Sequence, residues 1–473
     1  MNGLSQKRYL ELPLPTEDDP RSDQQRILDS LAAAGVEERV HIPVHILREL
    51  YPLLDNAKWK ITVSLAWNGE NWEMVEIEEG DTTAQHYGLA VDLGSTTVVA
   101  RLLDCNSGEI LKEVSCFNKQ IQWGTDILSR IFYCKDNREK LEEVRRATVE
   151  SICECMDKLD ASHSALSMVI AGNTTMIHFL LGMDAFCVFY TPHAVHADRP
   201  GFQLARNLDI PLKGYVYCYP AKSNYLGGDI ISGMIDTELY KKNEISVFFD
   251  IGTNGELVIG NKEFLLCGAG AAGPALEGGV VRTGMRADIG AVDEVKIRDG
   301  NIFVHVIGNS APQGICGSGI IDLIAELFLE GWIDIRGKLS PEKSPLIQER
   351  DNQLCVEYAP GLYFYQKDID EFIRTKSAAH TMVEIMLRES GLDLNQADRF
   401  YVAGAFGKYV SKESAITIGM YPDMDRDHII NAGNSSLEGA QKLLLNRVSS
   451  LTSTRSWKKW FIFSSPKWRI SWN

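Results

Sequence analysis

The spacing of apolar and polar residues predicts a small α/β domain at the start of the chain. Residues 22–35 have a helical pattern, with a capping box at its start and a glycine at its end. A second helical pattern covers residues 42–54. Two alternating runs at 60–67 and 72–78 flank an Asn-Gly pair, which favours a β-hairpin. We therefore expect residues 1–86 to form a domain of their own.

Two short loops later in the chain share one pattern. Each follows an apolar run and places an aspartate just before a glycine and a hydroxyl residue. The loops are Val91-Asp92-Leu93-Gly94-Ser95-Thr96-Thr97 and Phe249-Asp250-Ile251-Gly252-Thr253-Asn254-Gly255-Glu256. The first runs directly into an apolar stretch at 98–103, so the pattern predicts a strand, a tight turn and a second strand. Glycine allows close approach to a ligand, and turn N–H groups can cradle phosphate oxygens.

These loops supply the candidate site residues. Asp92 and Asp250, at the strand ends, can hold a hydrated Mg²⁺ ion, and Asp250 is also a catalytic candidate. Glu256 leaves two roles open, at the metal or at a backbone amide. Facing each other, two such hairpins would hold one nucleotide from both sides. The residues expected at the phosphates are Gly94, Ser95, Thr96, Thr97, Gly252, Thr253, Asn254 and Gly255.

Two further elements add candidates. The stretch 401–407 is a short strand with a glycine-bearing turn, where Gly404 and Gly407 would offer bare backbone to an adenine face. Asp229 stands at the start of a predicted helix, where it could position the attacking water or act as a base. A plain helix N-cap is an equally weighted alternative for Asp229. The phosphate-binding pattern G-x-x-x-x-G-K-[ST] is absent from the sequence.

Other motifs carry weaker interpretations. The spacing G-x-G-x-x-G at 268–273 matches a dinucleotide fingerprint, but an early Gly-Gly pair breaks the following helix, which disfavours that reading. Cys316 precedes a predicted helix, and a buried thiol is favoured over a reactive one. His193 and His196 have metal-ligand spacing with no third ligand in view. Asn173, after an apolar strand, could orient a partner or a water molecule.

The three loops, in this order, resemble the actin, Hsp70 and sugar-kinase superfamily of ATPases. Further stretches resemble the ATPase region of reductive activators of corrinoid proteins. They are residues 90–104, Ser129-Arg130-Ile131, 171–176, 273–293 and 314–319. The resemblance implies an α/β fold with two ATPase lobes built on duplicated ribonuclease-H-like domains, preceded by a small α/β domain similar to the family's middle domain.

On this reading, residues 87–245 form ATPase lobe I and residues 246–446 form lobe II, after the 1–86 domain. The segment after Arg447 contains four Trp, seven Ser and no acidic residue. We interpret residues 447–473 as an aberrant or disordered tail. A basic aromatic segment that binds a membrane or a partner is the alternative for this tail.

The resemblance also implies the activity. In the expected reaction, Mg²⁺-dependent hydrolysis of ATP drives the reduction of a corrinoid methyl-carrier protein from Co(II) to Co(I). Family members usually carry an N-terminal ferredoxin-like domain with a [2Fe–2S] cluster, whereas no cysteine precedes Cys105 here. We therefore expect no iron–sulfur cluster in this chain and a separate ferredoxin-like electron donor. A homodimer is left open.

Composition agrees with a cytoplasmic protein. The formal charge of −16 disfavours nucleic acid as a partner. The chain has no apolar run of 18 residues and no apolar leader, so we expect no membrane span. Its ten cysteines are scattered without a C-x-x-C pair, which is typical of a reducing compartment. Two alternative functions stay open: a small-molecule kinase of the same fold, and an ATP-driven scaffold or chaperone-like protein.

Overall fold

A computed structural model of the chain describes residues 2–124, 126–161, 164–190, 194–224, 226–252, 255–270, 281–393, 396–404, 409–447 and 460–462. The chain divides into two compact units. The first unit comprises Met1–Asp236 and Ser436–Trp457, and the second comprises Thr237–Ser435 and Lys458–Asn473. The chain thus enters the second unit from the first and returns to the first near its end.

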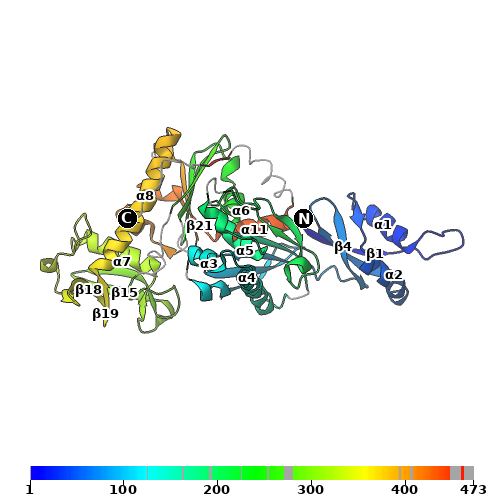
Figure 1. Cartoon of the computed structure of the whole chain (residues 1–473), viewed down its shortest axis with the longest axis horizontal. Coiled ribbons are helices and arrows are strands. Elements are labelled where there is room, and N and C mark those ends of the chain that lie inside the picture. Colours follow the sequence, from blue (N-terminus) through cyan, green and yellow to red (C-terminus); the bar gives the residue numbers. More distant parts are fainter. Residues whose placement is uncertain are drawn as a thin grey trace. The chain divides into compact units, whose positions relative to one another are not determined.

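The first unit opens with a four-stranded sheet in the order β1-β3-β4-β2 (Figure 1). Strands β3 and β4 form the expected hairpin, and the side chain of Ser22 accepts a hydrogen bond from the Gln25 amide at the start of α1. Apolar residues of both helices and of β3 form one core. The elements are β1 (Ser5–Glu11), α1 (Asp23–Ala33), β2 (Val40–His41), α2 (Val44–Asn56), β3 (Lys60–Trp67) and β4 (Trp72–Glu79).

A six-stranded sheet in the order β7-β6-β5-β8-β10-β9 forms the rest of the first unit. Strand β5 pairs antiparallel with β6 and parallel with β8. Every residue of β8 is buried, as expected for a parallel strand covered on both faces. The strands are β5 (Tyr87–Leu93), β6 (Thr97–Asp104), β7 (Ile110–Phe117), β8 (Ala165–Gly172), β9 (Gly201–Leu204) and β10 (Tyr215–Cys218).

Helices cover both faces of this sheet, because successive side chains of a strand point to opposite sides. Val98 and Ala100 of β6 belong to the core that includes α4, whereas Arg101 of β6 reaches α11 through Glu438. The helices are η1 (Lys119–Trp123), α3 (Ile127–Cys134), α4 (Arg138–Lys158), α5 (Thr174–Leu180), η2 (Phe186–Phe189), η3 (Ala205–Leu208), α6 (Gly228–Thr237) and α11 (Ser435–Leu445).

The second unit repeats the same sheet plan. Strand β11 pairs antiparallel with β12 and parallel with β20, within the order β21-β20-β11-β12-β13-β22. Its first five strands therefore copy the order β10-β8-β5-β6-β7 of the first unit. The strands are β11 (Ser246–Ile251), β12 (Gly255–Gly260), β13 (Leu265–Gly270), β20 (Arg399–Ala403), β21 (Ile429–Gly433) and β22 (Trp460–Ile462).

A long insertion between β13 and β20 carries two three-stranded sheets, in the orders β15-β14-β16 and β17-β18-β19. Helix α8 ends at Ser390 and is capped by Gly391, which adopts a left-handed conformation with φ of 70°. The remaining elements of the second unit are η4 (Leu239–Lys241), β14 (Ala291–Arg298), β15 (Asn301–Val306), η6 (Ile307–Asn309), β16 (Gly314–Ile315), α7 (Gly317–Leu329), η7 (Pro341–Lys343), β17 (Ile347–Arg350), β18 (Gln353–Ala359), β19 (Leu362–Tyr365), α8 (Gln366–Ser390), α10 (Lys412–Thr417) and η9 (Arg426–His428).

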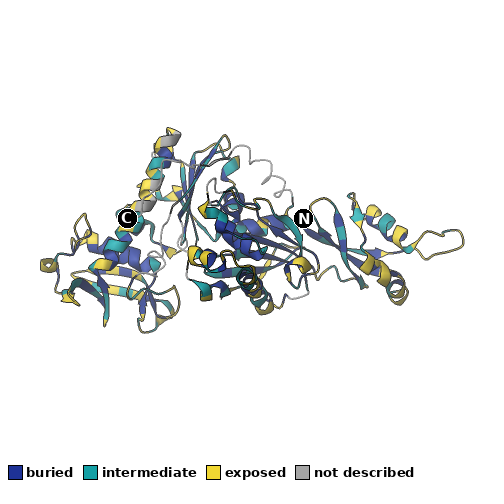
Figure 2. Cartoon of the chain, viewed as in Figure 1, coloured by how far each residue is buried: buried dark blue, intermediate teal, exposed yellow. Residues whose placement is uncertain are grey.

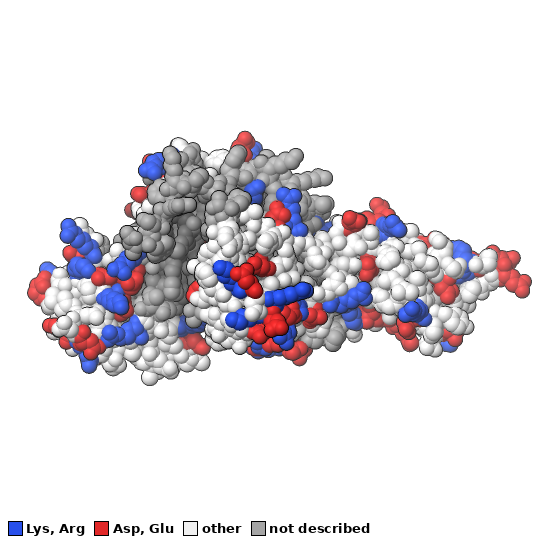
Figure 3. Space-filling model, viewed as in Figure 1, with Lys and Arg blue, Asp and Glu red and all other residues white. Residues whose placement is uncertain are grey.

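Burial and charge follow this arrangement. The central strands of each unit are buried, while α1, α2 and the outer turn of α4 expose one face (Figure 2). On the face drawn in Figure 3, acidic and basic side chains of the described residues are intermixed. The strand β22 lies in the segment expected to be an aberrant tail; its flanking residues are outside the described part of the chain.

Helix α11 joins the first unit, although the sequence-based division placed residues 435–445 in lobe II. It packs closely against α6: a Cβ built on Gly439 would lie 1.9 Å from the carbonyl oxygen of Ser232. The hydroxyl of Ser232 donates to the Ser436 carbonyl at 2.6 Å, and the hydroxyl of Tyr219 donates to the Gly439 carbonyl at 2.8 Å. These contacts fix the helix because its backbone lies directly on a neighbouring backbone.

A Gly439→Ala substitution should reduce the free energy of unfolding by about 1–3 kcal/mol, because the added methyl meets backbone that has little room to move. Lys442→Ala is the matched control on the same helix. It removes an exposed ammonium group that pairs with the carboxylate of Asp236 and donates to its carbonyl, and should change stability by less than about 1 kcal/mol. Urea unfolding measures both, and equal stability of the two variants would contradict this account of the packing.

Candidate phosphate and carboxylate site

Three carbonyl oxygens of the turn between β5 and β6 accept hydrogen bonds from Asn118 and Arg130. The side-chain amide of Asn118 donates to the Gly94 carbonyl at 2.9 Å, and its backbone N–H donates to the Thr96 carbonyl at 2.9 Å. The Arg130 guanidinium donates to the Ser95 carbonyl at 2.6 Å. In a trans peptide the N–H points opposite to the carbonyl. The following N–H groups therefore point away from Asn118 and Arg130.

Two glycines of this region have no room for a side chain. A Cβ built on Gly94 would lie 2.5 Å from the Thr97 carbonyl oxygen, and one built on Gly172 would lie 2.8 Å from the Leu93 carbonyl oxygen. Gly172 ends β8 and pairs with Leu93 in the parallel register. The ends of β5 and β8 are thus in direct backbone contact at the turn.

Two carboxylates meet at these strand ends. Asp92 lies at the end of β5, where the hydroxyl of Ser436 donates to its Oδ1 at 2.8 Å. Asp229 lies in the first turn of α6, and its Oδ1 accepts a hydrogen bond from the Ile230 N–H at 2.9 Å. A Cβ built on Gly227 would lie 2.6 Å from this Oδ1 and 2.5 Å from the Cα of Asn173. The start of α6 is therefore packed against the loop after β8.

The environment of Asp229 favours its protonated form. Desolvation by burial is the main cause, and the nearby charge of Asp92 adds to it; together they raise the pKa of Asp229 to about 7. The hydrogen bond from Ile230 opposes this shift. A carboxyl group with a pKa near neutrality can exchange a proton at physiological pH. The structure therefore brings Asp92 and Asp229 into one electrostatic site, as a proton-transfer role requires.

The second loop has a comparable arrangement within the second unit. Asp250 lies near the end of β11, beside Glu256 in the antiparallel register and beside Ala403 in the parallel one. A Cβ built on Gly404 would lie 2.9 Å from Oδ1 of Asp250 and 2.7 Å from the Ile251 carbonyl oxygen. Gly404 also has φ of 87°, which favours glycine. The structure thus joins Asp250 and Gly404, which the sequence placed in separate motifs.

The remaining candidates of the second loop are only partly described. Gly252 follows β11 and Gly255 opens β12, so both flank the turn. Thr253, Asn254 and Gly407 lie outside the described residues.

The weaker motifs take structural roles where they are described. The side chain of Asn173 caps α5 by accepting from the Met176 N–H at 2.9 Å. Cys316 is buried and donates to the Val292 carbonyl, as favoured from sequence. Gly268 lies inside β13, paired antiparallel with Leu257, so the dinucleotide-loop reading is excluded.

The described residues contain no group of three or more His, Cys, Asp or Glu side chains that could hold a metal ion. His196 is exposed there, and His193 is outside the described part. Each loop instead offers a carboxylate, Asp92 or Asp250. This suits Mg²⁺, which retains several waters and takes one or two protein carboxylates beside phosphate oxygens.

Three residues that shape the site were not among the predicted site residues. Ser436 and Asp92 are separated by 344 positions, so no local pattern connects them. Asn118 follows β7 and carries no motif. Arg130 appeared only within a stretch that supports the family resemblance. A buried arginine near a glycine turn could have indicated an anion site, but burial is not visible in sequence.

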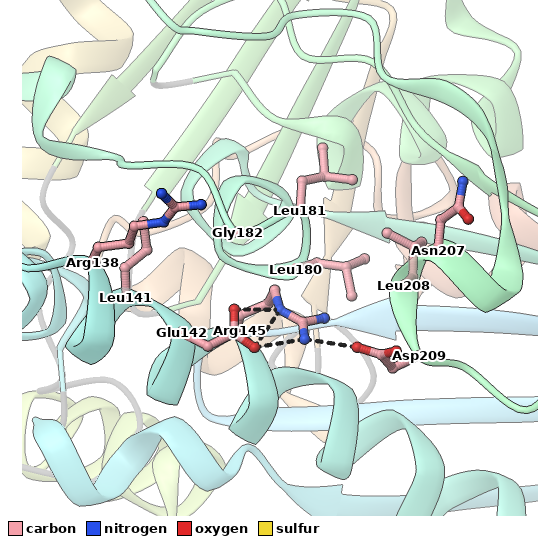
Figure 4. A pocket seen from close by; sticks show the side chains of 10 residues that line it. All are labelled: Arg138, Leu141, Glu142, Arg145, Leu180, Leu181, Gly182, Asn207, Leu208 and Asp209. Atoms are coloured by element: carbon pink, nitrogen blue, oxygen red, sulfur yellow. Dashed lines mark hydrogen bonds and ion pairs between the residues drawn. The ribbon is translucent and has the colours of Figure 1, made fainter.

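A separate cavity of about 470 Å³ lies beside α4 and α5 (Figure 4). One of its two arginines, Arg145, forms ion pairs with Glu142 and Asp209, both at 2.7 Å. The positive charge of Arg145 is therefore neutralised within the protein. The residues that line the cavity are Arg138, Leu141, Glu142, Arg145, Leu180, Leu181, Gly182, Asn207, Leu208 and Asp209.

Comparison with known proteins divides the chain into three consecutive regions. Residues 1–84 match the RACo linker region, residues 87–242 the RACo middle region, and residues 244–457 the C-terminal domain of RACo, the ASKHA domain. The chain belongs to the RACo family. This confirms the resemblance stated from sequence and the ATPase-type fold class. The name "middle" falls on residues 87–242, whereas we had compared residues 1–86 with a middle domain.

Individual relatives agree with this family. A solved structure of a reductive activator for corrinoid, iron-sulfur protein superposes with a TM-score of 0.90 at 35% identity, over 98% of this chain and 76% of that one. The corrinoid activation enzyme RamQ of Eubacterium limosum is 32% identical over 76% of this chain, which spans 64% of that enzyme's length. A [Co(II) methylated amine-specific corrinoid protein] reductase of Methanosarcina barkeri is 24% identical over 76% of this chain and 70% of the relative.

Among the described residues of this RACo-family chain, no helix is both long and apolar enough to pass through a bilayer.

The pKa of Asp229 predicts a pH-dependent stability. Because the folded-state pKa of about 7 lies above the usual aspartate value, the folded protein keeps a proton that the unfolded chain releases. The resulting stabilisation is complete below about pH 4 and is lost as the pH rises to the folded-state pKa. Asp229→Asn removes this titration. The midpoint temperature of the variant, measured relative to that of the wild type, should therefore rise between pH 5 and 8. Thermal unfolding in metal-free buffer measures it, and a constant difference between the two proteins would contradict the assignment.

Proposed function

We propose that this protein is an ATP-dependent reductive activator that returns a corrinoid protein from Co(II) to Co(I). The observation that carries the proposal is the match to three consecutive RACo regions, together with relatives named as corrinoid activation enzyme and Co(II) corrinoid protein reductase. One electron reduces Co(II) to Co(I), and a separate ferredoxin-like protein donates it. Hydrolysis of ATP to ADP and phosphate drives the step.

The site residues support nucleotide chemistry. The amides of the first turn, held by Asn118 and Arg130, bind phosphate oxygens, and the turn after Asp250 does the same in the second unit. Bound Mg²⁺ supplies neutralisation of phosphate charge. In each loop the carboxylate, Asp92 or Asp250, would hold water ligands of such an ion. The backbone at Gly404 would leave room for the adenine-bearing part of the nucleotide.

Asp229 completes the proposed mechanism. Its raised pKa suits it to accept a proton from the attacking water near neutral pH. Its neighbour Asp92 accepts a hydrogen bond from the Ser436 hydroxyl, which would keep this carboxylate in one direction if it holds the waters of a metal ion. Binding energy that differs between the ATP and ADP states can then drive a change in the partner complex.

A spectroscopic assay tests the function directly. A Co(II) corrinoid protein is mixed anaerobically with this protein, an artificial low-potential reductant and Mg-ATP, and growth of the Co(I) absorption band is recorded. We expect growth that requires ATP. Asp250→Ala should slow it by about 10–100-fold, since the metal loses an orienting carboxylate. Asp423→Ala, which removes an exposed ion pair with Arg426, should leave the rate unchanged.

The alternatives give different results in the same assay. ATP consumption matched by a phosphorylated small molecule, without Co(I), would support the kinase function. Nucleotide-dependent partner binding without Co(I) would support the scaffold function. Either result would overturn the activator proposal.

A further inference from the structure

Arg130 is a fully buried guanidinium on α3, with 0% of its surface exposed. Its Nε donates to the Gly124 carbonyl at 2.9 Å. Its Nη1 donates to the Ser95 carbonyl at 2.6 Å and to Oε1 of Gln120 at 3.2 Å. All three acceptors are uncharged, so these bonds orient the side chain without neutralising it.

The charge of Arg130 has no counter-ion among the described residues. It takes part in none of their ion pairs, and its Nη2 has no hydrogen-bond partner there. Asp126, the nearest acidic influence on it, is exposed and caps α3 by accepting from Ser129. Burial lowers the pKa of Arg130 to about 10, which leaves it cationic at neutral pH.

Three other arginines of the first unit are paired. Arg26 contacts Asp19 at 2.6 Å, Arg101 contacts Glu113 at 2.6 Å, and Arg145 is paired on two sides (Figure 4). Burying a charge without a partner is expensive, so an unpaired buried cation calls for an anion that the folded chain does not supply. Arg130 is held against the turn that the proposed function assigns to phosphates.

We propose that Arg130 is a positioning residue that makes the first turn selective for polyphosphate. Its contact with the Ser95 carbonyl points the Thr96 N–H to the opposite side, toward a bound anion. Its positive charge reinforces the same peptide dipole, and the charge of a bound polyphosphate compensates it. The inference rests on the proposed nucleotide binding. It adds the residue whose positive charge favours ligands that carry more phosphate groups.

Two substitutions separate charge from hydrogen bonding. Arg130→Gln keeps a side-chain donor but removes the charge, whereas Arg130→Lys keeps the charge but loses the forked guanidinium. Arg145→Gln is the matched control, because the charge it removes is already neutralised by Glu142 and Asp209. Calorimetric titration of each protein with AMP and with ATP, both in Mg²⁺ buffer, gives the ratio of their dissociation constants.

Arg130→Gln should reduce this ATP preference by about tenfold, from loss of one charge interaction at intermediate dielectric. Arg130→Lys should stay within about threefold of the wild type, and Arg145→Gln should match it. An unchanged ratio in Arg130→Gln, or an equal fall in both Arg130 variants, would overturn the inference, since a merely structural role depends on hydrogen bonds rather than charge. If the glutamine variant does not fold, a large loss in the lysine variant still overturns it, and retention supports it.

The outcome is separable from that of the proposed function. A wild-type protein that binds no ATP, or binds it without forming Co(I), would overturn the activator proposal. A wild-type protein that forms Co(I) beside an Arg130→Gln variant with full ATP preference would overturn only the role of Arg130.

Discussion

Parallel pairing of the first strand of each unit with a later strand is the constraint on which the candidate site depends. Strand β5 pairs with β8, and β11 pairs with β20. The carboxyl ends of parallel strands lie at one edge of a sheet, where ligands of α/β proteins usually bind. Because of this pairing, Asp92 lies beside the loop after β8, and Asp250 lies beside Gly404. The β5–β6 and β11–β12 hairpins alone would not bring either aspartate to these neighbours.

The return of the chain to the first unit adds a second constraint. Helix α11 can lie against α6 only because Gly439 has no side chain, and this contact brings Ser436 to Asp92. The orientation of the Asp92 carboxylate thus depends on a helix that lies more than three hundred residues later in the chain. A larger residue in place of Gly439 would therefore disturb the position of Asp92 at the β5–β6 turn through packing, without itself contacting Asp92.

The first unit places two acidic side chains close together and, beneath the same turn, a buried arginine. Asp229 is half-buried next to another carboxylate, and its proton is favoured. Arg130 is fully buried beneath the turn without a counter-ion among the described residues. A phosphate-bearing ligand with its metal ion would complement both features, because the metal compensates the carboxylates and the phosphates compensate the guanidinium. The electrostatics of the folded chain therefore favour an occupied site.

Local patterns by themselves determined the elements: the capped helix α1, the Asn-Gly hairpin β3–β4 and both glycine turns lie where periodicity and turn chemistry predicted them. The resemblance of ordered motifs determined the family. Only the tertiary structure decided which unit holds α11, and that Ser436 contacts Asp92. It also decided that Arg130 is buried without a partner, and that Asn173 caps a helix. These features arise from contacts between distant segments, and neither burial nor long-range pairing leaves a local trace in residue spacing.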